Sequence, residues 1–493
     1  MKRANLILLG LSAIVFSNIL AAQSANEENL SSLPLAPTPQ VSMAQVLPTP
    51  VSQNTPKVPI APPIGTAGQG SAPASQPAAP GTTVLTLKDA EALAVRNNPQ
   101  ITVARLLALA QQQVAREVRS NLWPTATGNI TGVDAQSGSR ITAGALNNPI
   151  IYERAAAGMT VTQLITDFGR TTNLVASANL AAKAESENAL ASIQQILLAV
   201  NRAFFNALQA QAVLSVAQQT VDARQIVADQ IGALYKNKLK SELDFSFANV
   251  NLAQAKLLLL DAQNNQEAAQ ATLSMVLGFT NVQAFQLRDD SGAVASPPEK
   301  VDDLIGQALV SRPELRSLQF QYESATKFQK AERDLLFPSI RAAGAVGFTP
   351  VGNVAVAPSP SAFNNTYGAV GANMEIPIFN GVQYFARSKE ASLRAQATNE
   401  RLRDLKNTIS RDVRTSWLGA NAAYQRLGVT QQLLDQTKLA LDLAQSRYKL
   451  GLGSIVEVSQ AQLQETQAEI SYAQAGYDYR LSLAILSYET TGI

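Results

Sequence analysis

The chain contains no cysteine and no histidine among its 493 residues. Without cysteine there are no disulfides, thiol nucleophiles or thiolate metal sites, and without histidine the commonest general base and metal ligand is missing. Only scattered Asp, Glu, Ser and Lys side chains remain for chemistry. We therefore expect no cofactor, no metal site and no enzymatic activity.

Net charge and long apolar runs are also lacking. The 39 basic residues are balanced by 37 acidic ones, so no global field attracts nucleic acid, and we expect no nucleic-acid partner. Beyond the N-terminus, no stretch approaches the roughly 18 uninterrupted apolar residues that indicate a membrane-spanning helix. If the chain enters a membrane, it is expected to do so with strands.

The first 82 residues have the composition of targeting and linking segments. Lys2 and Arg3 precede an apolar run from Leu6 to Leu20 and several small residues, which predicts a secretory signal peptide over residues 1–25. An uncleaved anchor is the alternative, but the run is shorter than the roughly 20 residues of a spanning helix. Residues 26–82 are rich in Pro, Ala, Thr, Ser and Gln, which predicts a disordered periplasmic extension, either a plain linker or a partner-binding segment.

The rest of the chain is predicted to consist of two tandem copies, residues 83–290 and 291–493. In each copy an amphipathic helical pattern ends at a proline, Pro99 in the first and Pro313 in the second. An aromatic–Pro pair ends 25 positions after each of these prolines, at Trp123-Pro124 and Phe337-Pro338. Equal spacing of this kind indicates an internal duplication.

After each aromatic–Pro pair the hydrophobic period changes from 3.6 to 2, which predicts two strands per copy. The apolar positions expected on one face are Ala155, Ala157, Met159 and Val161, then Ile340, Ala342, Val346 and Phe348, then Val370, Ala372, Met374 and Ile376. Strands of about 10 to 13 residues are long enough to cross a bilayer when tilted. Two hairpins would leave open edges in lipid, so oligomerisation is required.

Two long helical patterns follow the strands. They begin near Gly169 and Gly381 and continue without proline to about Leu234 and Tyr448. At 1.5 Å per residue, each helix would reach about 100 Å. Their many alanines favour close coiled-coil packing. A periplasmic coiled-coil structural or adaptor protein is the alternative function, although it does not explain the strands.

These features together resemble the TolC or outer-membrane efflux protein family over Val84 to Gly492. The resemblance implies an α+β membrane protein in the outer membrane with a long periplasmic portion. It implies a homotrimer with an antiparallel coiled-coil helical barrel and a transmembrane β-barrel that receives four strands from each protomer. The implied function is the exit duct of a tripartite efflux or type I secretion system. The implied partners are a periplasmic adaptor (membrane fusion protein) and an inner-membrane pump or ABC exporter.

The resemblance is most specific at the stretch from Arg447 to Val458, RYKLGLGSIVEV, which is similar to the family's periplasmic tip. It implies a periplasmic gate in which Tyr448 bonds Asp244 and Glu457 contributes to a cation-binding acidic ring. Glu457 as a merely solvated side chain is the alternative. Gly453 stands where the family has a clasping arginine, so the gate is expected to close differently.

Two further sites are implied by position. Leu450, Gly451 and Leu452, with Leu239 on the first tip, match the family's adaptor-docking motif, although the first tip lacks the glycine. Trp123 and Phe337 lie where helix changes to strand and are expected to anchor the membrane rim, with core packing as the alternative.

Overall fold

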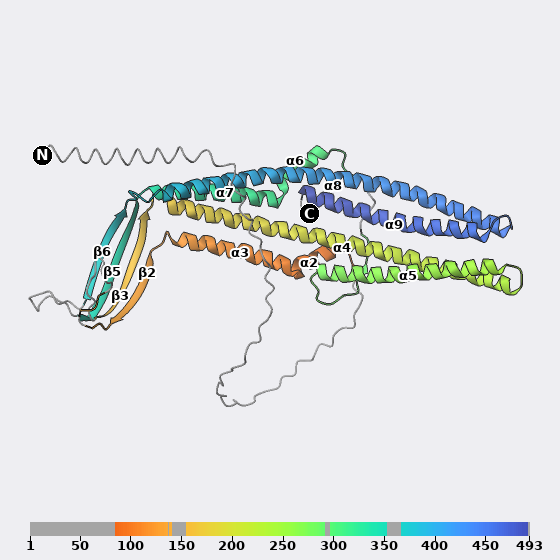
Figure 1. Ribbon diagram of the computed structural model, residues 1–493, viewed down its shortest axis with the longest axis horizontal. Helices are drawn as coiled ribbons and strands as arrows, with labels where there is room; N and C mark the ends of the chain where they lie inside the picture. Colours follow the sequence, from red (N-terminus) through yellow and green to blue (C-terminus); the bar gives the residue numbers. More distant parts are fainter. Residues whose placement is uncertain (1–83, 137, 141–153, 291–295, 353–365, 492–493) are drawn as a thin grey trace, which may run out of the picture. The chain divides into compact units, whose positions relative to one another are not determined.

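The computed structural model describes residues 84–136, 138–140, 154–290, 296–352 and 366–491 (Figure 1). They belong to one compact unit, Ala78–Ile493. The predicted signal peptide (1–25) and the predicted Pro-rich extension (26–82) lie outside the described residues, as does most of the predicted loop between the last two strands.

The two halves of the chain present the same order of elements: two short helices, two strands and two long helices. The first half contains α2 (Leu87–Asn97), α3 (Pro99–Ser120), β2 (Thr125–Val133), β3 (Arg154–Thr166), α4 (Arg170–Lys236) and α5 (Glu242–Val276). The second contains α6 (Val301–Ser311), α7 (Pro313–Arg333), the 3₁₀ turn η1 (Asp334–Leu336), β5 (Ser339–Gly352), β6 (Thr366–Glu375), α8 (Gln383–Lys449) and α9 (Ile455–Thr491). Two short parallel strands, β1 (Val84–Leu85) and β4 (Gln286–Leu287), pair beside them.

The helices α4 and α8 are the longest elements, with 67 residues each. Neither contains proline, and the rise of an α-helix gives each a length of about 100 Å, as predicted. Gly169, with φ 111°, directly precedes α4, while Gly381 and Val382, with φ 60° and 69°, delay the start of α8 to Gln383. None of the helices in the described ranges combines the length and hydropathy needed to cross a bilayer.

The helices pack in a regular scheme. The helix α4 packs along α5 and α7, and α8 packs along α9 and α7 (Figure 1). Eight of the 18 residues buried along α4 are alanines: Ala182, Ala184, Ala189, Ala191, Ala203, Ala207, Ala217 and Ala228. Their small volume lets neighbouring helix backbones approach closely over a long distance. The predicted close packing of alanine-rich helices is therefore confirmed.

In each half, the residue before the helix-starting proline bonds the start of that helix to the end of the last helix of the same half, but the two residues differ. In the first half, Asn98 caps α3 by accepting a hydrogen bond from Gln100 N (2.9 Å) and donates from Nδ2 to Val276 O at the end of α5 (2.8 Å). In the second half, Arg312 takes this place and reaches the end of α9. The hydrogen bond from the neutral Asn98 side chain in the first half thus corresponds to the Arg312–Glu489 ion pair in the second.

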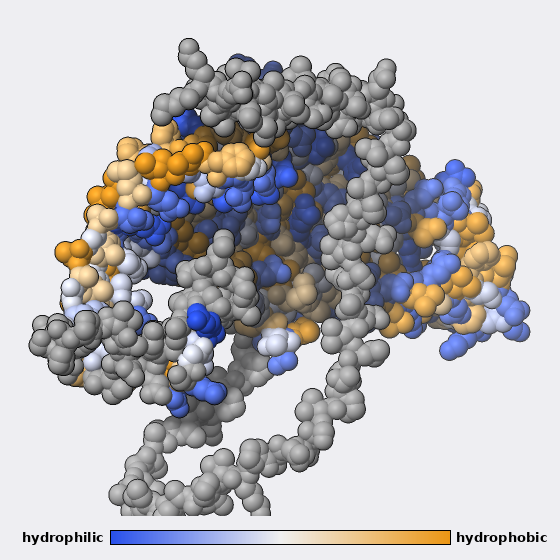
Figure 2. Space-filling view, turned by 60° about the vertical axis from the view of Figure 1, so that its left-hand side comes forward, coloured by the Kyte–Doolittle hydropathy of each residue, from blue (hydrophilic) through white to orange (hydrophobic). Residues whose placement is uncertain are grey.

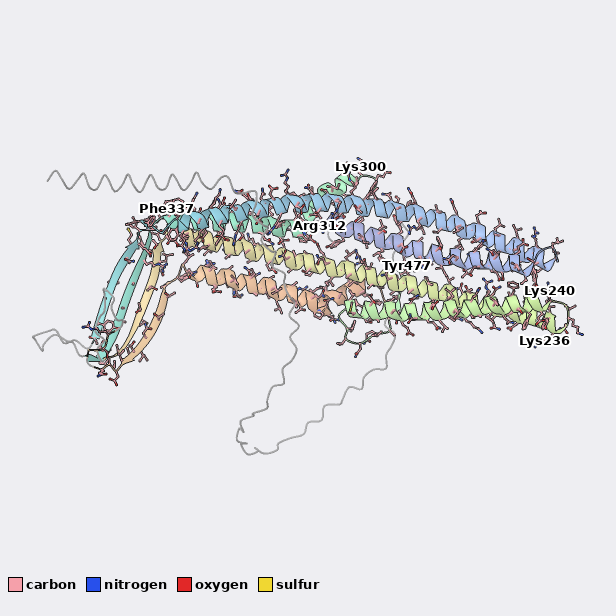
Figure 3. All side chains as sticks on the ribbon, in the orientation of Figure 1. Lys236, Lys240, Lys300, Arg312, Phe337 and Tyr477 are labelled. Carbon is pink, nitrogen blue, oxygen red and sulfur yellow. The ribbon has the colours of Figure 1, made fainter. Side chains whose placement is uncertain are left out.

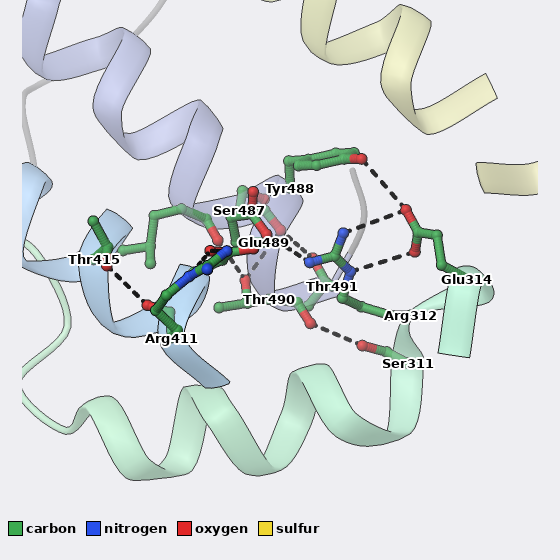
Figure 4. A network of polar contacts seen from close by, with 12 residues as sticks. Ser311, Arg312, Glu314, Arg411, Thr415, Ser487, Tyr488, Glu489, Thr490 and Thr491 are labelled. Carbon is green, nitrogen blue, oxygen red and sulfur yellow. Dashed lines mark hydrogen bonds and ion pairs between the residues drawn. The ribbon is translucent and has the colours of Figure 1, made fainter. Parts of the chain in front are cut away.

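The Arg312 guanidinium lies between two carboxylates (Figure 4). It donates to Glu489 Oε2 at 2.5 Å and to Glu314 Oε1 at 3.3 Å, and Tyr488 donates from its hydroxyl to the same Glu314 oxygen at 3.4 Å. Only 10% of the Arg312 side chain is exposed. Burial raises the pKa of Glu489, and the nearby Arg312 opposes that rise. The network therefore fixes the C-terminal end of α9 against the start of α7.

Replacement of Arg312 by alanine should destabilise the fold strongly. It would leave two carboxylates without their cation in a half-buried site, which typically costs about 3–5 kcal/mol. Thermal unfolding followed by circular dichroism in detergent measures the loss. Arg403→Ala is the matched control, because Arg403 pairs with Glu400 on the surface, where 76% of its side chain is exposed, and such a pair contributes about 0–1 kcal/mol. Equal loss in both variants would contradict a stabilising role for the buried network.

The four longer strands form one antiparallel sheet in the order β2-β3-β5-β6. The middle pair, β3 and β5, joins the two halves of the chain. The prediction that the last strand includes Ile376 is wrong by one residue, since β6 ends at Glu375, opposite Ser339. Ile376 would face Pro338, which has no amide hydrogen to continue the ladder.

The two faces of the sheet differ in polarity. The register places Ile130 opposite Ala157, Ala157 opposite Phe348, and Met159 opposite Val346, so the predicted apolar positions share one face. On the other face, Thr125 lies opposite Thr162, and their hydroxyl oxygens are 2.7 Å apart. The apolar face is not covered by the described chain: Ile130 is 92% exposed and Val370 is 90% exposed. Figure 2 shows hydrophobic residues on the surface of the chain.

Candidate gate and docking site

The turn between α4 and α5 and the turn between α8 and α9 have the same backbone structure. In the first, Lys238 N donates to Tyr235 O and Leu239 N to Leu234 O, both at 2.8 Å. In the second, Gly451 N donates to Tyr448 O at 3.1 Å and Leu452 N to Arg447 O at 2.9 Å. This is the Schellman pattern that closes a helix C-terminus. We name residues 237–241 the first tip and residues 450–454 the second tip.

The missing glycine of the first tip does not alter its turn. Lys238 adopts φ 60° where Gly451 adopts φ 75°, so a lysine occupies the left-handed conformation that the turn requires. Around these turns, Leu239, Leu450 and Leu452 are each at least 70% exposed. The structure therefore brings Leu450, Gly451 and Leu452 into one turn with its apolar side chains in solvent, and places Leu239 at the same position of the other tip.

The tip glycine offers a test of this geometry. Replacement of Gly451 by alanine should cost about 1 kcal/mol of stability, because a β-carbon is unfavourable in the left-handed conformation. Gly428 lies inside α8, and no atom lies within 4 Å of the position that an added methyl group would take, so Gly428→Ala should instead stabilise by about 0.5–1 kcal/mol. Opposite shifts in melting temperature are expected. A higher melting temperature for Gly451→Ala than for the wild type would show that residue 451 does not adopt the left-handed conformation.

Asp244 caps α5. Its Oδ2 accepts hydrogen bonds from Ser241 Oγ at 2.8 Å and from Ser241 N at 3.2 Å, while Asp244 N donates to Ser241 Oγ at 3.1 Å. This reciprocal capping box satisfies two free donors at the helix start. The pattern of a serine followed three residues later by an acid is visible in the sequence, and could have identified this role.

Tyr448 does not form the bond to Asp244 that the resemblance implied. Among the described residues its buried hydroxyl has no hydrogen-bond partner. The ring instead packs against apolar clusters from both tip hairpins, one that includes Ile231 and Leu252 and another that includes Val458. The ammonium of Lys240, on the first tip, lies 3.9 Å from the centre of the ring. Tyr448 therefore joins the two hairpins through its ring rather than its hydroxyl.

Glu457 has a cationic partner within its own hairpin. Its Oε1 lies 3.6 Å from Arg447 Nε, and Arg447 also donates to Leu452 O at 3.4 Å. A β-carbon at Gly453 would lie 3.1 Å from Glu457 Oε2 and 3.3 Å from Arg447 Cβ. Gly453 thus leaves room for this ion pair. Sequence reasoning missed Arg447 and Lys240, because the resemblance directed attention to acidic positions.

Polar contacts between the two hairpins continue away from the tips. Asn251 of α5 hydrogen-bonds the hydroxyl of Ser459 on α9, and Arg224 of α4 donates to Thr466 Oγ1 at 3.4 Å. These residues contribute polar groups to the lining of a cavity of about 180 Å³ between the helices. Burial lowers the pKa of Arg224 and raises that of Glu465. The hairpins are therefore held together by ring, hydrogen-bond and charge contacts over several helical turns.

The two predicted rim aromatics lie where each helical segment gives way to a strand. Trp123 comes two residues before β2 and is 65% exposed, and Phe337 comes two residues before β5 and is 50% exposed. Phe337 contacts the ring of Phe168, just before α4, at a centroid distance of 6.3 Å. Neither side chain enters the core of the described chain.

Long helical hairpins with compact turns, joined to a small antiparallel sheet, are the fold of outer-membrane channel proteins. The outer-membrane channel OprN has the same fold, with a TM-score of 0.71 at 18% identity over 83% of this chain and 90% of that one. The sequence profile of the outer membrane efflux protein family matches residues 92–279 and 304–488. The chain belongs to the outer membrane efflux protein family and is located in the outer membrane.

Relatives of known name agree with this assignment. The chain is 22% identical over 409 residues to the probable outer membrane lipoprotein SilC of Salmonella typhimurium, covering 80% of this chain and 84% of the relative. It is 21% identical over 297 residues to the outer membrane protein TolC of Escherichia coli (strain K12), covering 59% of this chain and 60% of the relative. The family consists of efflux channels and is not a family of enzymes.

Proposed function

We propose that the chain is the outer-membrane exit duct of a tripartite efflux or type I secretion system, a passive channel formed by a homotrimer. The observation that carries the proposal is the four-stranded sheet, which has two open edges and an uncovered apolar face. In a bilayer, unpaired backbone groups of an open edge cost several kcal/mol each, so such a sheet must be closed by further strands. Further copies of the same chain supply those strands.

Closure by three copies gives a transmembrane β-barrel of twelve strands, with β2 of one protomer beside β6 of the next. The apolar face that contains Ile130 and Val370 then meets lipid, and the threonine-rich face lines the lumen. Trp123 and Phe337 lie at the junction of sheet and helices, where aromatic rings anchor a protein at the membrane interface. The two halves of the chain contribute one hairpin each, in keeping with an internal duplication.

The helices of one chain also leave apolar side chains uncovered. Those on α3 that are more than half exposed are Val103, Leu106, Leu107 and Leu109, and those on α8 are Phe385, Leu393, Leu418, Val429, Leu439 and Leu443. Apolar stripes of this extent on long helices are usually buried against another chain. In the proposed trimer they pack between protomers and close a helical tunnel that continues the barrel into the periplasm.

The tips are proposed to be the gate and the docking site. Tyr448, Asp244 and Glu457 lie in or beside the two turns, and the exposed Leu239, Leu450 and Leu452 offer apolar anchors to a periplasmic adaptor. An inner-membrane pump or ABC exporter supplies the energy, since the chain has no nucleotide-binding motif of its own. Residues 1–25 are proposed to direct export, and residues 26–82 to act as a linker.

A pair of neighbouring substitutions tests the orientation of the sheet. Ile130→Arg places a charge on the proposed lipid face and should cost about 2–4 kcal/mol near the bilayer centre, so that less trimer reaches the outer membrane. Asn129→Arg places the same charge on the opposite face of β2, toward the proposed lumen, and should be tolerated. Trimer yield from outer-membrane fractions measures both. The proposed orientation is wrong if Asn129→Arg is the more damaging of the two.

Conductance tests the function itself. Purified protein reconstituted in a planar bilayer should produce discrete current steps, small in the wild type because the tips are closed and larger when the tips are loosened. Protein carrying Ile130→Arg, which should assemble poorly, serves as the matched control and should give few steps. An absence of steps in the wild type and in every tip variant, from preparations that contain inserted trimer, would refute the channel.

A further inference from the structure

Tyr235 and Tyr448, which precede the two tips at equivalent positions in the two halves, have different partners. Tyr235 stacks on Phe245 within its own hairpin, with ring centroids 5.3 Å apart and planes inclined by 4°. Tyr448 contacts residues of the opposite hairpin instead. Among the described contacts, it is therefore Tyr448 that is placed to restrain the distance between the two hairpins.

Lys240 completes the environment of Tyr448. Its ammonium lies 3.9 Å from the ring centroid, well inside the roughly 6 Å within which a cation is attracted to an aromatic face. Among the described residues, no carboxylate lies within ion-pair distance of Lys240. Both side chains are half-buried, which weakens screening by water. Among the described contacts, the partner of the Lys240 ammonium is therefore the ring of Tyr448.

The hydroxyl of Tyr448 forms no hydrogen bond between the two hairpins in the described chain. It is buried without a partner in the described chain, and the carboxylate of Asp244 is engaged with Ser241. Removal of an unpaired buried hydroxyl should cost nothing, since a buried polar group without a hydrogen bond is itself destabilising. At Tyr448, the α8–α9 hairpin is therefore held to the α4–α5 hairpin by contacts of the aromatic ring.

We propose that Lys240 is a gate-positioning residue, and that its cation–π contact with Tyr448 holds the α8–α9 hairpin against the α4–α5 hairpin in the closed state. This inference rests on the proposed channel function. Outward movement of the α8–α9 hairpin would withdraw the ring from the ammonium, so opening must break one such contact in each protomer. The contact biases the gate toward closure without any hydrogen bond from Tyr448 to Asp244.

The chain offers a matched control. Lys236 ends α4 in the same turn region and is exposed, and no ring contact is found for it among the described residues (Figure 3). Lys236→Gln and Lys240→Gln therefore remove the same charge from the same end of the α4–α5 hairpin, but only the second removes the ring contact. Lys240→Arg keeps a cation over the ring, and Tyr448→Phe keeps the ring without its hydroxyl, whereas Tyr448→Leu removes the ring.

Planar-bilayer recordings of these variants, each checked as trimer by gel filtration, test the proposal. One lost contact should raise the open-to-closed ratio about two- to fivefold, and three lost contacts should raise it about tenfold to a hundredfold. Lys240→Gln and Tyr448→Leu should both show this increase, and their combination should exceed neither by much. Lys236→Gln, Lys240→Arg and Tyr448→Phe should stay within about twofold of wild type.

The results separate this inference from the channel function. If the wild type conducts but Lys240→Gln behaves like Lys236→Gln, the contact does not hold the gate and the channel stands. If Tyr448→Phe opens the gate as far as Tyr448→Leu, the hydroxyl matters and the proposed role of Lys240 is wrong. If Lys240→Gln does not assemble, the two Tyr448 variants decide the question. If inserted trimers of all variants and the wild type pass no current, the channel function itself fails.

Discussion

The hydrogen-bonding needs of the sheet edges constrain the rest of this protein. In the described chain, β2 and β6 each have one neighbouring strand, so a row of backbone donors and acceptors on each is left without a partner. Water could satisfy these groups, but the hydrocarbon interior of a membrane cannot. The family places the chain in the outer membrane, and the apolar face of the sheet suits that location. The proposed trimer would satisfy this constraint, because neighbouring copies would supply the missing strands.

The helical part fits the same solution. Because β2 and β3 lead from α3 into α4, and β5 and β6 lead from α7 into α8, closure of the strands into the proposed barrel would also arrange the helices that continue them in a ring. Alanine-rich seams allow close packing within the chain, while larger apolar side chains remain exposed and would pack between protomers in the proposed trimer. The buried Arg312 network secures the end of α9 against the start of α7, while α9 packs along α8 and α5 packs along α4 as paired helices.

The sequence predicted the order of elements well because its signals are local. Prolines at 99, 124, 313 and 338 set element boundaries, and alternation of apolar residues identified which strand positions share a face. The contacts at and beside the tips were harder to predict from the sequence. Tyr448 and Lys240 are far apart in the chain, and their contact depends on how two hairpins pack, which no local pattern encodes. The Arg447–Glu457 pair also depends on the tip turn, and the resemblance to relatives with an arginine at position 453 pointed elsewhere.

The central claim, that strands of neighbouring copies close the sheet, can be tested by cross-linking, since the native chain has no cysteine. One cysteine placed on β2 and one on β6 can form a bridge only between protomers if these strands are neighbours in the barrel. A scan of such pairs across β2 and β6, oxidised in intact outer membranes, should contain registers that convert the monomer band on a reducing-agent-free denaturing gel into a closed trimer band. Monomers at every register, or ladders that extend beyond three chains, would contradict the account.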